Sequence, residues 1–103
     1  MKYFMIRYQR ANGTQEEWHK DIVRFISELD NDPELKGKIL YRCMKIREGS
    51  DYYHLAAAAD EKAIKTLQQR DFFKRYTEKT KLVAGGEVVV TPLEIIAETA
   101  QPR

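Results

Sequence analysis

The sequence predicts an α+β domain whose strands and helical regions follow the order β-α-β-β-α-β. Apolar residues recur at helical spacing between residues 14 and 30 and again between 61 and 82. β-prone runs flank both regions, and the turn-forming segment Glu48-Gly49-Ser50-Asp51 joins the two middle strands. This is the order of the ferredoxin-like fold, in which helices cover one face of a four-stranded antiparallel sheet.

The first half of the chain contains an expected strand, a helix and a second strand. The strand at residues 3–9 ends before Asn12-Gly13. Thr14 and Glu17 have the spacing of a capping box, which marks a helix start. Residues 30–33, Asp-Asn-Asp-Pro, end that helix, and the next strand is expected at 38–47. The apolar residues at helical spacing are Trp18, Ile22, Phe25, Ile26 and Leu29.

The second half begins with a returning strand at residues 52–59. Its alanine run would suit a helix by propensity, but Asp60 resembles an N-cap, so we end the strand there. The helical region that follows is expected to break at Asp71, where a new cap restarts it, and to stop at Gly85-Gly86. A fourth strand is expected at 88–98, and Pro92 confines it to a sheet edge or a bulge. The domain thus spans residues 1–98, with a loose tail at 99–103.

Composition excludes several classes of function. At 103 residues the chain has room for one core, and its net charge of +2 gives no sign of nucleic-acid or membrane binding. A single cysteine, Cys43, excludes an internal disulfide, and with two histidines a multi-histidine metal site would need carboxylates or a second subunit to complete it. No segment approaches the roughly 20 apolar residues of a membrane span. We therefore expect a cytoplasmic protein without a metal or other cofactor.

The strands are apolar on both faces. The first strand carries Phe4, Ile6 and Tyr8 on one face, and Tyr3 and Met5 on the other. The fourth strand and the alanine-rich third strand show the same two-sided pattern. Helices from the same chain cover one face of such a sheet, and no segment remains for the second. A homodimer that pairs through the sheet faces is the expected solution.

The segment from Asp60 to Tyr76, with the sequence Leu67-Gln68-Gln69-Arg70-Asp71-Phe72-Phe73 at its centre, resembles a known family. It is similar to the second helical region of the antibiotic-biosynthesis monooxygenase family, within the dimeric α+β barrel superfamily. There a short helix, a break before an aromatic residue and a second helix connect strands three and four. The resemblance implies a barrel of two sheets packed face to face, with a pocket between sheet and helices in each subunit.

The family resemblance also implies a function. Members include cofactor-independent oxygenases of aromatic substrates, haem-degrading enzymes and proteins without an assigned role. The resemblance therefore implies oxidation of a small aromatic or polyketide-like molecule without a cofactor.

The chain departs from the family pattern at several positions. Many members carry a histidine at the end of the first short helix, where this chain has Leu67, and a Glu-x-Trp pair where it has alanines at 56–59. The asparagine, tryptophan and histidine of the haem-degrading branch would fall at about Arg7, Leu67 and Thr77, so haem ligation is not expected. These substitutions favour an alternative, a non-catalytic small-molecule-binding or interaction module that has lost the family active site.

His54 and Arg7 are the candidate catalytic residues. Each is a polar residue within an expected apolar strand, on strands that neighbour each other in this fold. His54 could take a proton from a phenol while Arg7 holds the resulting anion, provided that both side chains point to the helix-covered face. The alternative is structural: His54 satisfied at the dimer face, and Arg7 paired with an acid across it.

Aromatic residues supply the candidate substrate-binding wall. They could equally be core residues, because their spacing is that of a buried helix face or strand. RNA binding, which the same topology also supports, is not expected because the third strand lacks the basic-Gly-aromatic signature. The candidate substrate-binding residues are Tyr41, Trp18, Phe72 and Phe73.

Overall fold

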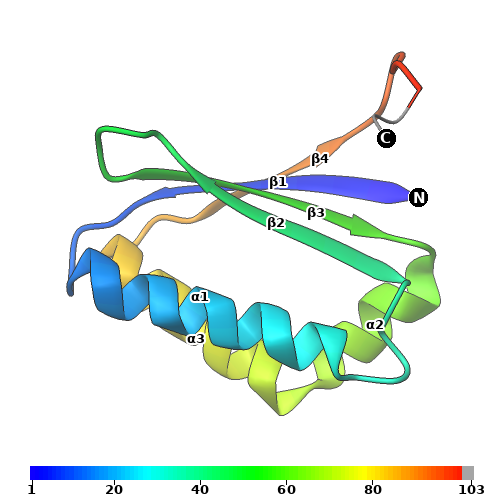
Figure 1. Cartoon of the computed structure of the whole chain (residues 1–103), viewed down its shortest axis with the longest axis horizontal. Helices are drawn as coiled ribbons and strands as arrows, with labels where there is room; N and C mark the ends of the chain where they lie inside the picture. Colours follow the sequence, from blue (N-terminus) through cyan, green and yellow to red (C-terminus); the bar gives the residue numbers. More distant parts are fainter. Residues whose placement is uncertain (101–103) are drawn as a thin grey trace.

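The computed structural model of the chain describes residues 1–100 and has the predicted α+β architecture. Four antiparallel strands form one sheet in the order β2-β3-β1-β4, which is the ferredoxin-like arrangement. The helices lie together on one side of this sheet, and the other side is bare (Figure 1). The elements are β1 (Lys2–Gln9), α1 (Gln15–Asp30), β2 (Ile39–Lys45), β3 (Asp51–Ala58), α2 (Glu61–Gln69), α3 (Asp71–Ala84) and β4 (Val89–Leu93).

Two of the expected helix caps form. The hydroxyl of Thr14 accepts a hydrogen bond from the backbone N–H of Glu17 at 3.2 Å, at the start of α1. The carboxylate of Asp60 accepts one from the backbone N–H of Ala63 at 2.8 Å, at the start of α2. The alanine run therefore does end a strand, as predicted.

The break between α2 and α3 differs in detail from the prediction. Asp71 is the first residue of α3, not its cap; Arg70 precedes the helix and makes no side-chain capping bond. Instead the Arg70 guanidinium reaches the loop after α1, where its Nε donates to Oδ2 of Asp32 at 2.8 Å. Asp71 still favours the helix start, because a carboxylate in the first turn interacts well with the helix dipole.

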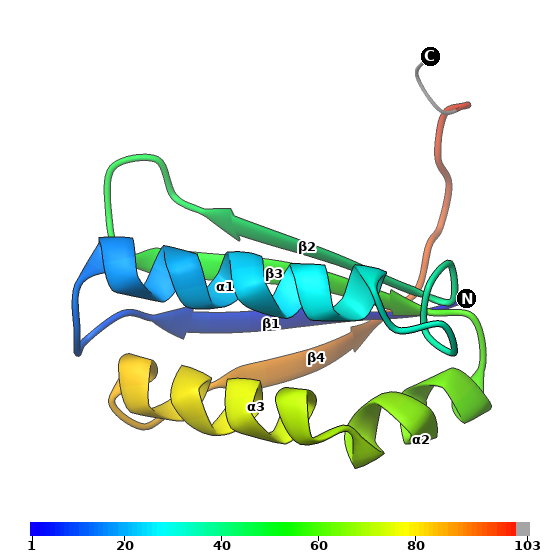
Figure 2. The same ribbon diagram turned by 60° about the horizontal axis from the view of Figure 1, so that its bottom comes forward.

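β4 is shorter than predicted. It pairs with β1 alone, so it is an edge strand, and Pro92 lies opposite Phe4 as an edge proline. The strand ends at Leu93, and residues 94–100 have no regular structure and leave the sheet (Figure 2). The expected tail at 99–103 falls partly outside the described residues, because these end at residue 100.

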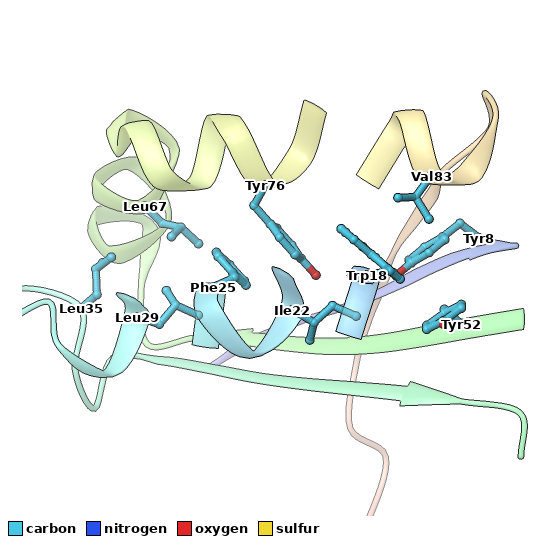
Figure 3. Packing of buried hydrophobic residues seen from close by; sticks show 10 residues of the cluster. All are labelled: Tyr8, Trp18, Ile22, Phe25, Leu29, Leu35, Tyr52, Leu67, Tyr76 and Val83. Atoms are coloured by element: carbon cyan, nitrogen blue, oxygen red, sulfur yellow. The ribbon is translucent and has the colours of Figure 1, made fainter. Parts of the chain in front are cut away.

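The core lies between the sheet and the two long helices, α1 and α3 (Figure 3). The apolar stripe predicted for α1 is buried at Trp18, Ile22, Phe25 and Leu29. The residues drawn in Figure 3 come from both sides of this layer: Tyr8, Trp18, Ile22, Phe25, Leu29, Leu35, Tyr52, Leu67, Tyr76 and Val83.

The second face of the sheet is open and mostly apolar, with Arg7 and Arg42 as its cationic residues. The register places Met5 opposite Leu55, so both point to the face without helices. On the same face Leu40, Met44 and Leu93 are 43%, 40% and 41% exposed. The two-sided apolar pattern is therefore confirmed for the isolated chain.

Candidate active site

An apolar cavity of about 320 Å³ lies between the inner face of the sheet and helices α2 and α3. Its volume is at the lower end of the range that holds small organic ligands. The space exists because β3 carries alanines here: Ala56 lies between Phe4 of β1 and Tyr41 of β2 in the strand register. Other apolar lining residues are Ile6, Ile39, Ala57, Ala58, Ile64, Leu67, Phe73, Val88 and Val90.

The polar groups of the cavity differ in what they can offer a ligand. The hydroxyls of Thr77 and Thr80 each donate to a backbone carbonyl within α3, so the helix itself uses both hydrogens. Gln68 and Lys81 are exposed lining residues, and they mark where the cavity meets solvent. The remaining polar groups are the phenols of Tyr41 and Tyr76.

His54 lies directly behind these two phenols. Its side chain is fully buried and does not line the cavity. Nδ1 lies 3.1 Å from the Tyr76 hydroxyl and 3.5 Å from that of Tyr41. Nε2 lies 2.9 Å from the Tyr8 hydroxyl, which accepts a hydrogen bond from Nε1 of Trp18 at 2.8 Å. The imidazole therefore reaches the cavity through Tyr41 and Tyr76.

Burial determines the charge state of this cluster. It lowers the pKa of His54 to about 4, because the imidazolium form would lose its hydration. It raises the pKa of Tyr8, Tyr41 and Tyr76 above the usual phenol value for the same reason. At neutral pH the cluster is thus a neutral ring surrounded by protonated phenols. Such a ring can orient hydroxyl groups, but it cannot take a proton from a substrate directly, because it is buried behind the phenols.

Arg7 does not join His54. In the antiparallel ladder Ile6 lies opposite His54, whereas Arg7 lies opposite Tyr53 on the open face. The Arg7 side chain is exposed there, on the far side of the sheet from the cavity. The expected arrangement of a base and a cation around one ligand is therefore not formed within the chain. Strand alternation could not have shown this, because it does not say which face is covered.

The four predicted wall residues separate into two pairs. Tyr41 and Phe73 line the cavity. Trp18 and Phe72 instead line a groove between α1 and α3. Trp18 is 1% exposed and stacks on Tyr76 with ring centroids 5.7 Å apart, so it belongs to the core.

Sequence reasoning missed Tyr8 and Tyr76 as partners of His54. Each carried a weak signal: Tyr8 is in phase with Phe4 and Ile6 on the first strand, and Tyr76 follows Phe72 by one helical turn. Their convergence on one imidazole depends on contacts between residues 46 and 22 positions apart.

The Cys43 thiol is not a candidate nucleophile. Burial raises its pKa to about 11, so it is protonated and unreactive at neutral pH.

Residues 1–100 contain no cluster of three or more His, Cys, Asp or Glu side chains arranged to hold a metal ion. Over the same residues, none of the helices is both long and apolar enough to cross a membrane.

Solved structures share this architecture closely. A mutant form of SnoaB from Streptomyces nogalater, a cofactor-independent oxygenase, superposes with a TM-score of 0.76 at 13% identity, covering 97% of both chains. A putative antibiotic biosynthesis monooxygenase from Caulobacter crescentus gives 0.75 at 18% identity, covering 93% of this chain and 90% of that one. Rv0793 from Mycobacterium tuberculosis gives 0.75 at 11% identity, covering 96% and 98%. The chain has the fold of the antibiotic biosynthesis monooxygenases.

The resemblance seen in the sequence is thus confirmed at the level of the monooxygenase fold. No family model matches the sequence, and no curated protein matches it. Three positions at which the chain departs from the family pattern, Ala57, Leu67 and Thr77, line the cavity. These three departures lie in the ligand-sized space, whereas the fourth, Arg7, lies on the open face of the sheet.

Proposed function

We propose that the cavity binds a small aromatic molecule and that the protein supports its oxidation by dioxygen without a cofactor of its own. One observation carries the proposal: an apolar cavity presents the protonated phenols of Tyr41 and Tyr76. A ligand with an aromatic body and one oxygen atom fits such a lining. The fold is shared with SnoaB, a cofactor-independent oxygenase, and this supports the choice of reaction.

The proposed chemistry needs no reductant. The substrate is an aryl ketone that carries an acidic methylene group. The phenols donate hydrogen bonds to the ketone oxygen and stabilise the enolate that forms when the methylene proton leaves to solvent near Lys81. The carbanion adds to dioxygen, and the resulting peroxide loses water to give a second carbonyl. Each methylene group and each dioxygen molecule thus give one carbonyl group and one water molecule, with all electrons supplied by the substrate.

Anthrone is a suitable probe because its methylene group lies between two rings conjugated to the ketone. We expect the protein to accelerate oxygen uptake by anthrone above the spontaneous rate, with anthraquinone as the product. Ala56→Leu should abolish most of this acceleration because it fills the cavity, whereas Ala97→Leu, at an exposed position, should not.

Thermal melting of both alanine variants separates a blocked cavity from a damaged fold, since overpacking a filled site destabilises. Anthrone binding under nitrogen, measured by quenching of Trp18 fluorescence, separates binding from chemistry. Binding without faster oxygen uptake would contradict the oxygenase proposal and leave the non-catalytic binding module.

We also propose that two copies pair through the open sheet face. Leu40, Met44 and Leu93 on that face are exposed, and no helix within residues 1–100 covers them. A second copy supplies an identical apolar surface and closes the assembly as a symmetric dimer.

A further inference from the structure

The hydrogen bonds around His54 define where its proton lies. The Trp18 indole nitrogen can only donate, so the Tyr8 hydroxyl oxygen accepts from it at 2.8 Å. Tyr8 must then place its own hydrogen. Among its contacts within residues 1–100, the acceptor in reach is Nε2 of His54, at 2.9 Å.

The two tautomers of His54 differ in how well they satisfy this chain. If Nε2 carried the hydrogen, the Tyr8 oxygen would accept twice and its buried O–H would have no acceptor among the described residues. An unmatched buried donor is costly. If Nδ1 carries the hydrogen, Tyr8 donates to Nε2 and Tyr76 can donate to the Tyr41 oxygen, so the hydrogen left over is that of Tyr41, which lines the cavity. The Nδ1–H tautomer is therefore the stable one.

This tautomer determines the direction of the hydrogen bonds between His54 and the phenols of the cavity. Nδ1–H donates to the Tyr76 oxygen at 3.1 Å and, more weakly, to that of Tyr41 at 3.5 Å. Both phenols thus accept from the ring and keep their own hydrogens. The other polar neighbours of the Tyr76 hydroxyl are the Tyr41 hydroxyl and the Cys43 sulfur at 4.0 Å, which is a weak acceptor. Both tyrosines line the cavity.

We infer that His54 acts as a positioning residue that fixes Tyr41 and Tyr76 as hydroxyl donors, so that the cavity selects aromatic ligands bearing an acceptor oxygen. A carbonyl or phenolate oxygen matches these donors. A hydrocarbon leaves the Tyr41 donor unmatched. The raised pKa of both phenols supports their role as donors, because a protonated phenol keeps the hydrogen that it donates. The inference rests on the cavity of the proposed function but not on the oxidation.

A matched pair of probes tests the selectivity. 1-Tetralone and tetralin share one ring skeleton and differ by the carbonyl oxygen. An apolar cavity without aligned donors binds tetralin more tightly, because the carbonyl loses its hydration. We expect the protein to bind 1-tetralone several-fold more tightly. Tyr41→Phe should lower this preference without weakening tetralin, because Tyr76 remains as a second donor. Tyr53→Phe, on the open face, should keep the wild-type preference.

Nitrogen-15 spectra of the imidazole give a second readout that a purely structural role would not move. The wild-type protein should show His54 protonated at Nδ1, and Tyr8→Phe should shift the ring toward the other tautomer and reduce the preference for 1-tetralone. An Nε2–H tautomer in the wild-type protein, or tighter binding of tetralin, would overturn the inference. A preference for 1-tetralone without any oxygen uptake from anthrone overturns the proposed oxidation alone, so the two failures are distinguishable.

Discussion

At the scale of single residues, the cluster around His54 shows how burial changes a side chain's role. Histidine is usually the group that titrates near neutral pH. Here burial lowers its pKa to about 4, and the contacts of the ring are phenols, with no carboxylate to stabilise the cation among the described residues. The ring therefore stays neutral and orients three hydroxyl groups. The phenols, not the imidazole, face the ligand space.

The lowered pKa of His54 predicts a pH-dependent stability. The unfolded chain binds this proton near pH 6.5 and the folded protein near pH 4. Between these values the unfolded state binds more protons, so the free energy of unfolding falls as the pH falls from 6.5 to 4 and this loss stops below 4. The total is up to about 3 kcal/mol. Urea unfolding at several pH values measures it.

The matched control for this prediction uses the other histidine. His54→Gln should flatten the decline between pH 6.5 and 5, a range above the usual carboxylate pKa values. His19→Gln should retain it. An unchanged slope in His54→Gln would show that another group causes the decline.

At the scale of elements, the ends of α3 depend on loops from elsewhere in the chain. Its start is anchored by the bond from Arg70 to Asp32, which also holds the pKa of that carboxyl below its usual value. Its end is covered by the loop after β1. The backbone N–H of Ala11 donates to the Val83 carbonyl at 2.7 Å, and the side-chain Nδ2 of Asn12 donates to the Leu82 carbonyl at 2.8 Å. These donors satisfy carbonyls that a helix end leaves without partners.

The glycine that ends α3 should be intolerant of substitution. Gly85 has a φ of 70°, and a Cβ there would lie 3.1 Å from the Cβ of Ala11. Gly85→Ala should lower the free energy of unfolding by about 1–2 kcal/mol, because the left-handed conformation crowds a Cβ against the backbone. Gly49→Ala is the control, since its Cβ would meet the nearest side-chain atom at an ordinary 3.7 Å. Equal urea midpoints for the two variants would contradict the prediction.

At the scale of the whole molecule, the sheet separates two environments. Its inner face meets the helices, and its outer face is open in the single chain (Figure 1). The cavity lies on the inner side, and exposed apolar side chains lie on the outer side. Beyond the last strand, Ile95 and Ile96 are 45% and 85% exposed on a segment that leaves the sheet (Figure 2). Exposed apolar area of this kind favours association.

The proposed dimer gives the last prediction. Light scattering coupled to size exclusion should report a mass near twice 12.1 kDa. Leu55→Lys should shift the mass to that of the monomer, because a third cation beside Arg42 and Arg7 would have to be buried among like charges on the open face. Val23→Lys, on the exposed side of α1, should remain dimeric. A wild-type monomer at micromolar concentration would refute the dimer.

The sequence by itself determined the order of the elements, the caps at Thr14 and Asp60, the edge position of the strand with Pro92, and the apolar character of both sheet faces. These features depend on local spacing and on backbone chemistry, which neighbouring residues specify. The sequence also pointed to the family whose fold the chain shares.

The tertiary structure decided which face each strand residue occupies and which side chains meet. The two-residue period of a strand shows which side chains of that strand share a face, but it does not say which face the helices cover. The structure puts His54 and Arg7 on opposite sides of the sheet. The length of β4 follows from its ladder with β1, which ends where Tyr3 lies opposite Leu93. The cluster of His54 with Tyr8 and Tyr76 joins three separate elements, so its charge state depends on burial that exists only once those elements have packed together.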